Sequence, residues 1–246
     1  MQELRRWIDL IYPPRCPVCD RFLPRGEGPG LCEACAASFQ EIALPYCRRC
    51  GLPLMDIGHD DERLCEACLR APPAYEKARA VYLYEGGALE AVHRFKYGRR
   101  AHLARILGPR LADLARRTLP AGLRASAMPV PLHPKRLRER GFNQSLLLAR
   151  HVAGLSGLEL DYRTLQRSRN TPPQVTLGRE ERKKNVRTAF EVKPMKRGVP
   201  ENVVLVDDVA TTGSTLNACS RALVRAGAKR VFCLVLARAA NRKNGT

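Results

Sequence analysis

Apolar residues divide this chain into short runs that alternate with amphipathic stretches. The run 203–206 is apolar and mostly β-branched, which predicts a strand buried on both faces, as in the middle of a parallel sheet. Further strand-like runs are 78–84, the start of 128–132, and 230–236. Helical spacing of apolar residues follows each strand, over 86–95, 102–119, 146–152 and 216–226, and Pro109 should kink or split the second of these helices. The alternation predicts an α/β fold, a mostly parallel sheet flanked by helices.

Two carboxylates, Asp207 and Asp208, directly follow the run 203–206. They lie at the carboxyl end of the predicted strand, where open α/β sheets bind ligands. The loop that leads from these acids into the helix 216–226 is small and polar, and contains Ala210, Thr211, Thr212, Gly213, Ser214 and Thr215. Thr212, Ser214 or Thr215 could cap that helix, whose free N–H groups attract anions, and Gly213 lets the backbone approach a ligand. This stretch therefore offers N–H groups that can donate hydrogen bonds to a phosphate, beside carboxylates that can accept from hydroxyls or bind a metal. A sugar phosphate requires both.

Two other interpretations of the acid pair compete with this one. A lone Asp-Asp is most often an acidic turn that caps an ordinary helix. A strand followed by an acid also occurs in nucleotide hydrolases, but these carry a companion G-x-x-x-x-G-K-[ST] loop, and the sequence contains no such stretch.

Eight of the ten cysteines form four C-x-x-C knuckles near the amino end: Cys16/Cys19, Cys32/Cys35, Cys47/Cys50 and Cys65/Cys68. Because Zn²⁺ takes four thiolates tetrahedrally, eight cysteines fit two structural zinc sites. Sequential pairing of the knuckles is the simplest arrangement, although spacing alone leaves crossed pairing open. A thioredoxin-like redox pair is disfavoured because no βαβ pattern lies near the knuckles. Cys219 and Cys233 are expected to be small buried core residues, and His59 a surface residue rather than a ligand.

The chain is strongly basic, with a formal net charge of +19 and a pI near 10. Such a charge favours a polyanionic partner, nucleic acid or a phosphorylated ligand, although a generally basic solvated surface is the alternative. One basic stretch interleaves cations with aromatic residues and is a candidate nucleic-acid-binding patch: Arg94, Phe95, Lys96, Tyr97, Arg99 and Arg100. Its competing interpretation is a helix end rich in cations, which the helix dipole favours.

A second candidate for phosphate contact follows the predicted strand near residue 128. Three prolines stiffen the loop 129–134, and Lys135 and Arg136 come directly after it. A pre-ordered backbone that ends in two cations suits a pyrophosphate group. The segment 167–187 is polar and basic, and we expect it to act as a lid over the site or as an arm that follows nucleic acid.

No apolar run approaches the roughly 20 residues that span a bilayer, and the first twelve residues lack the uninterrupted apolar stretch of a signal peptide. We therefore expect a cytoplasmic protein without membrane insertion.

The whole string 203–215 resembles the phosphoribosyl pyrophosphate (PRPP) motif of type I phosphoribosyltransferases: an apolar strand, two acids, two small residues and T-T-G-S-T. Further stretches make the resemblance specific to one family. They are P-V-P-L-H-P-K-R at 129–136 and R-G-F-N-Q-S at 140–145, followed by Gln174, Arg179, Asn185-Val186 and Ala189-Phe190. Together these stretches are similar to the ComF family, which joins a zinc ribbon to a phosphoribosyltransferase fold. We expect an N-terminal helix and zinc-ribbon lobe over 1–73, and the resemblance implies a phosphoribosyltransferase-like domain over 74–246.

The resemblance also implies roles for the residues of the motif. Asp207 and Asp208 would accept the ribose hydroxyls and serve any catalysis, residues 210–215 would hold the 5-phosphate, and Lys135 and Arg136 would contact the pyrophosphate, with Mg²⁺ on the substrate oxygens. ComF-like proteins are associated with uptake of single-stranded DNA in natural transformation, where a helicase-like partner is expected. The alternative is an enzyme of nucleotide metabolism that transfers phosphoribosyl groups to a nitrogen acceptor, of which the sequence gives no sign.

Overall fold

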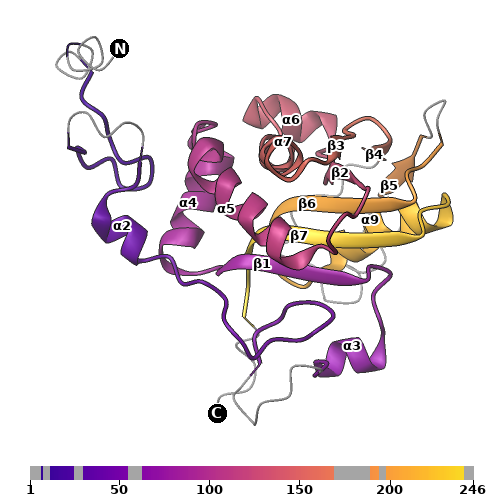
Figure 1. Ribbon diagram of the computed structural model, residues 1–246. Coiled ribbons are helices and arrows are strands. Elements are labelled where there is room, and N and C mark those ends of the chain that lie inside the picture. The colour runs from indigo at the N-terminus through magenta and orange to yellow at the C-terminus, as the bar shows by residue number, and fades with distance from the viewer. Residues whose placement is uncertain are drawn as a thin grey trace.

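A five-stranded parallel sheet forms the centre of the computed structural model, which describes residues 7, 12–24, 30–54, 63–168, 189–193 and 198–240 (Figure 1). The strand order is β1-β7-β6-β2-β3, so the two longest strands lie in the middle. The strands are β1 (Lys77–Leu83), β2 (Ser126–Pro129), β3 (Glu159–Leu160), β6 (Asn202–Ala210) and β7 (Arg230–Arg238). A separate antiparallel pair joins β4 (Leu165–Arg167) to β5 (Phe190–Val192).

Helices cover both faces of this sheet because the side chains of the central strands alternate between two apolar cores. Val204 and Val206 face one core, with α4 (Gly86–Tyr97), α5 (Leu103–Thr118) and α7 (Gln144–Ser156). Val203 and Leu205 face the other core, with α9 (Ser214–Arg225). Both faces of β6 are therefore buried, as its unbroken apolar run predicts.

The amino-terminal lobe lies against the edge strand β1. The linker between its second and third knuckles, residues 38–46, runs beside β1, since the Ile42 amide donates to the Val81 carbonyl. The third knuckle continues along β1, since the Ala78 amide donates to the Arg49 carbonyl. The described part of the lobe includes two short helices, α2 (Glu33–Ala37) near α4 and α3 (Glu66–Arg70) on the other side of β1 (Figure 1). Cys16, Cys32 and Cys35 pack in the core that contains α4, whereas Cys47, Cys50, Cys65 and Cys68 belong to the core that contains α9. The lobe thus reaches around the sheet edge to both faces.

The structure confirms the α/β class and a cysteine-rich lobe ahead of the sheet, and it refines several elements. β6 does not end at Val206 but continues through both acids to Ala210, because β7 pairs with it to the end. α5 is a single helix through Pro109, so the expected splitting is wrong. The stiff loop after β2 contains an additional short helix, α6 (Pro134–Arg140), which the prolines concealed. The expected boundary at residue 73 stays a prediction.

None of the helices in the described part of the chain is long and apolar enough to cross a bilayer.

Candidate functional site

The paired carboxylates lie at the carboxyl end of the central strand and have different partners. Asp208 is buried, and its Oδ1 lies 3.0 Å from Nζ of Lys96, a residue in the last turn of α4. Asp207 is half-buried, and its Oδ1 accepts hydrogen bonds from Ser145 Oγ at 2.8 Å and from the Asp208 amide at 2.9 Å. The site thus brings together residues from β6, α4 and α7.

The electrostatics of this group differ from those of exposed side chains. Burial raises the pKa of the Asp207 carboxyl, the Asp208 charge raises it further, and Lys96 and Ser145 only partly oppose this rise. Burial alone would lower the pKa of Lys96, but the Asp208 carboxylate offsets that effect and raises the Lys96 pKa above its ordinary value. Two acids and one cation so close together can bind hydroxyls and a hard cation, or share a proton.

The loop after β6 has the geometry of an anion site. Gly213 has φ 75°, a left-handed conformation that glycine adopts without strain, and it precedes the first turn of α9. Thr212 Oγ1 accepts a hydrogen bond from the Ser214 amide at 3.3 Å and donates to Ser214 Oγ at 3.0 Å. The N-cap residue is Gly213 and no side chain caps α9, so the expected cap by Thr212, Ser214 or Thr215 is wrong, although Thr212 contacts one amide of the first turn. The exposed hydroxyls of this loop and the amino end of the twelve-residue helix α9 directly follow the end of β6, which carries the acids.

The segment 140–145 explains how α7 reaches the acids. Gly141 ends α6 in a left-handed conformation, and Asn143 caps α7 by accepting a hydrogen bond from the Ser145 amide at 3.0 Å. Asn143 Nδ2 donates to the Val130 carbonyl at 3.2 Å, and the buried Gln144 donates to the Phe95 carbonyl at 3.2 Å. These bonds fix Ser145 against Asp207 and hold the end of α4, which carries Lys96, beside the strand.

Lys135 and Arg136 lie in the first turn of α6, after the loop that follows β2. This loop stays beside β6, because the Val130 amide donates to the Val206 carbonyl at 2.8 Å. Lys135 is exposed, Arg136 is half-buried, and His133 Nδ1 accepts from the Lys135 amide at 3.2 Å. Both cations are therefore available near the carboxyl edge of the sheet. Of the expected lid, only Arg167 and Ser168 are among the described residues, and the remainder of 167–187 lies outside them.

The candidate nucleic-acid patch does not form one surface. Phe95 is fully buried, with its ring centroid 5.8 Å from that of Phe142, so it cannot stack on a base without leaving the core. Lys96 forms an ion pair with Asp208 instead. Arg94 and Arg100 both bind Asp20 of the amino-terminal lobe, at 3.3 and 2.6 Å. The interpretation therefore needs correction at Phe95, whose place at helical spacing with Ala91 and Val92 indicated a core residue. Tyr97, 63% exposed, and Arg99 remain on the surface.

The eight knuckle cysteines gather into two groups of four. The sulfur atoms of Cys16, Cys19, Cys32 and Cys35 lie within 4.8 Å of one another, and so do those of Cys47, Cys50, Cys65 and Cys68. The knuckles therefore pair in sequence, which resolves the alternatives that spacing left open. Four converging thiols are the ligand set of a structural zinc site, so the donor chemistry fits one zinc ion in each group.

Sequence reasoning missed two buried side chains beneath the loop. A Cβ added at Gly213 would lie 3.4 Å from Tyr75 Oη and 3.8 Å from Arg238 Nη1. Arg238 is the last residue of β7 and is 4% exposed. For Arg238, the only signal in the sequence is its position directly after the apolar run 231–237. A single cation after a strand is not a recognisable motif.

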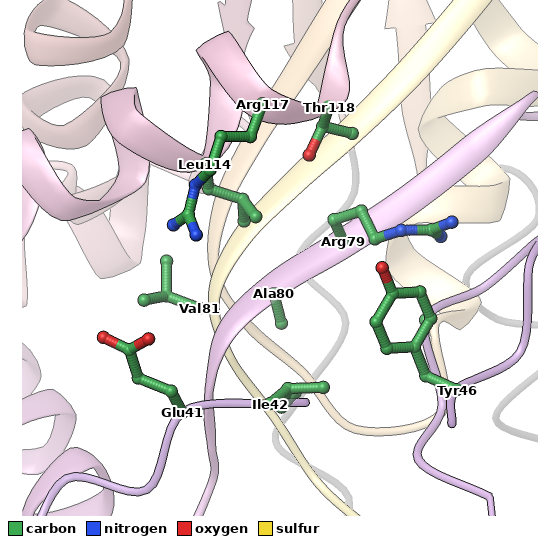
Figure 2. Close-up of a pocket in the computed structure, with 10 residues that line it drawn as sticks. Glu41, Ile42, Tyr46, Arg79, Ala80, Val81, Leu114, Arg117 and Thr118 are labelled. Atoms are coloured by element: carbon green, nitrogen blue, oxygen red, sulfur yellow. The ribbon is translucent and has the colours of Figure 1, made fainter. Parts of the chain in front are cut away.

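A separate hollow of about 230 Å³ lies on the outer side of β1, between the linker of the lobe and the end of α5 (Figure 2). Arg79 lies beside it, with its guanidinium 4.6 Å from the ring centroid of Tyr46. Of the described residues that line the hollow, none belongs to the acid pair or its loop.

Two family models match the chain and agree with this geometry. Residues 7–70 match a double zinc ribbon domain, and residues 144–245 match a phosphoribosyl transferase domain. The fold and the two tetracysteine groups thus define a phosphoribosyltransferase-fold protein with an amino-terminal double zinc ribbon.

Among named relatives, "DNA utilization protein YhgH" of Salmonella typhi is 35% identical over 92% of this chain and 98% of that protein. "Competence protein F" of Haemophilus influenzae is 32% identical over 85% of this chain and 91% of its own length. "Competence protein ComFC" of Bacillus subtilis is 27% identical over 80% and 79%. The chain belongs to the ComF/YhgH family, which confirms the resemblance found in the sequence.

Proposed function

We propose that the site at the end of β6 binds PRPP together with Mg²⁺. The observation that carries this proposal is the placement of the Asp207–Asp208 pair beside a glycine-containing loop at the amino end of α9. Ribose hydroxyls need acceptors and a phosphate needs N–H donors, and both lie at one edge of the sheet. The phosphoribosyl transferase match over residues 144–245 supports the same ligand class.

Each part of PRPP has a partner in this arrangement. Asp207 and Asp208 accept the 2- and 3-hydroxyls of ribose, and residues 210–215 surround the 5-phosphate. Lys135 and Arg136 contact the pyrophosphate, and Lys96 adds a third cation on the side of the acids. Mg²⁺ would be held by substrate oxygens and waters, since it retains several waters when few carboxylates are available. Its chemical contribution is to neutralise charge on the pyrophosphate.

The biological role that we propose is uptake or processing of single-stranded DNA during natural transformation. The relatives carry the names DNA utilization protein and competence protein, and the net charge of +19 favours a polyanionic partner. Tyr97 and Arg99 supply an exposed aromatic ring and a cation at the end of α4. In this role the chain acts in the cytoplasm beside a helicase-like competence partner.

The second candidate is a phosphoribosyltransferase that displaces pyrophosphate at the anomeric carbon with a nitrogen nucleophile. The raised pKa of Asp207 supports it, because a carboxyl that titrates near neutral pH can take the proton that the nucleophile loses. The two candidates share the ligand and differ in whether PRPP is consumed.

Calorimetric titration with PRPP and Mg²⁺ tests the ligand. We expect binding to the native chain and its loss in Asp208→Asn, which removes the charge that the hydroxyls and Lys96 require. Asp113→Asn is the matched control, because this acid pairs with Arg116 on the surface of α5. No binding to the native chain would refute the proposal. Release of pyrophosphate in the presence of candidate amines would favour the enzyme.

A further inference from the structure

Arg238 lies between the phosphate loop and the second tetracysteine group. It is the last residue of β7, where it pairs with Ala210 of β6 on one side and Leu83 of β1 on the other. Its guanidinium is therefore below the loop that begins at Ala210, and Nη1 comes within 3.8 Å of the position that a Cβ at Gly213 would take. The side chain is 4% exposed, so water does not solvate its charge.

One nitrogen of this guanidinium contacts the second tetracysteine group, whereas the other two have no partner in the part of the chain that the structure describes. Nη2 donates to Cys50 Sγ at 3.4 Å. Nε and Nη1 are buried and have no hydrogen-bond partner among the described residues. A buried guanidinium with two unused donors is costly unless a negative group completes its contacts. The Nη1 donor lies under the loop where an anion is expected, and it has the chemistry that a phosphate requires.

A second connection joins the same tetracysteine group to the first turns of α9. Arg49, inside the third knuckle, donates to the carbonyls of Pro73 and Tyr75 at 3.0 and 2.9 Å. The Ala74 amide in turn donates to Asn217 Oδ1 at 2.9 Å. The cysteine group, the segment 73–75 and the helix that begins at the loop are therefore one bonded unit. The first group, Cys16 to Cys35, packs in the other core and has no such connection in the contacts of the described residues.

We propose that Arg238 donates from beneath the loop to the phosphate bound there, and that metal in the second tetracysteine group holds Arg238 in place. Metal in this group would hold the sulfur of Cys50 in a fixed place, and that sulfur is the acceptor of the Nη2 hydrogen bond. Without metal the four sulfurs are not tied to one another, so Nη2 loses the fixed acceptor that keeps the guanidinium under the loop. The affinity for the 5-phosphate of the sugar then depends on the second metal site and not on the first. This inference rests on the proposed PRPP site.

The first test compares Arg238→Met with the native chain by calorimetry. We expect the affinity for ribose 5-phosphate and for PRPP to fall about 10- to 100-fold, the range for loss of a charged hydrogen-bond donor. The affinity for inorganic pyrophosphate alone should not change, because its proposed contacts, Lys135 and Arg136, belong to α6 and not to this loop. Arg238→Lys should bind more tightly than Arg238→Met but less tightly than the native chain, since lysine keeps the charge but lacks the planar set of N–H donors of a guanidinium. Arg230→Met is the control, at the other end of β7 on an exposed bidentate pair with Glu76.

The second test separates the two metal sites. Cys68→Ser disturbs the second group without removing the Cys50 contact, and Cys35→Ser disturbs the first. We expect each variant to lose about one zinc ion, and only Cys68→Ser to weaken ribose 5-phosphate binding, by about tenfold or more.

The outcomes distinguish this inference from the proposed function. If the native chain binds neither PRPP nor ribose 5-phosphate, the proposed site itself fails. If it binds both, and Arg238→Met binds them equally well, the role of Arg238 is refuted and the site stands. Equal weakening by Cys68→Ser and Cys35→Ser would refute the dependence on the second metal site. If Arg238→Met does not fold, Arg238→Lys and the two cysteine variants decide the matter by the same measurements.

Discussion

Lys96 and Asp208 form an ion pair of 3.0 Å across the interface between α4 and the end of β6. Both side chains are largely shielded from water, at 19% and 8% exposure. Lys96 belongs to the stretch that the sequence suggested for nucleic-acid binding, and Asp208 belongs to the sugar-phosphate motif. The ion pair therefore assigns one cation of the basic stretch to the ligand site.

Breaking this pair should destabilise the protein. Lys96→Met leaves the buried Asp208 carboxylate without its cation, which should cost about 1–3 kcal/mol in the free energy of unfolding by urea at neutral pH. The double variant Lys96→Met/Asp208→Asn should recover most of that loss, because neither charge is then buried. As a control, Arg230→Met breaks an exposed pair with Glu76, which solvent screens, and should cost much less than Lys96→Met. Equal losses for the two single variants would contradict a buried role for Lys96.

The raised pKa of Asp207, about 7, makes a prediction about pH. The folded state keeps a proton on this carboxyl that the unfolded chain releases near pH 4, so the native protein should lose stability as the pH rises from about 4 to 7. Asp207→Asn removes this dependence, and its stability relative to the native chain should increase between pH 5 and pH 8 by about 1 kcal/mol or more. Urea unfolding at a series of pH values measures it.

Ser145 provides a check on the same carboxyl. Its hydroxyl hydrogen bond favours the charged form of Asp207 and lowers the pKa. Ser145→Ala should therefore extend the loss of stability toward higher pH. A profile identical to that of the native chain would mean that Asp207 is not the titrating group.

The sequence predicted the centre of the fold because local patterns specify it. The apolar strand with its two acids, the small-residue loop and the paired knuckles are each continuous in the sequence, and each forms where it was expected. The partners Lys96 and Arg238 could not be predicted in the same way. Each comes from a different element, and only the strand order β1-β7-β6 and the docking of α4 bring them to the acids and to Gly213. Phe95 was misjudged because its neighbours are polar, although its own helical position faces the core.

Metal content should be about two zinc ions for each chain, from eight thiolates in two groups. Elemental analysis of the purified protein measures the ratio. Cys219→Ser and Cys233→Ser are the controls, because both residues are buried at the interface of α9 with the sheet and belong to neither group of four, so their loss should leave two zinc ions. A content near one would mean that one set of knuckles serves another purpose.

Variants of the basic stretch at the end of α4 should differ in their affinity for single-stranded DNA and in the salt dependence of that affinity. Native affinity should fall steeply with salt, and Arg99→Ala should reduce the slope of log K against log salt by about 0.7, the value for one phosphate contact. Tyr97→Ala should weaken binding about 5- to 100-fold with little change in slope, because it removes a stacked base. Phe95→Ala should instead unfold more readily, by about 3–5 kcal/mol. Arg225→Ala, an equal loss of charge on the exposed end of α9, should have little effect. An affinity that is flat from low to physiological salt would refute a direct role in holding DNA.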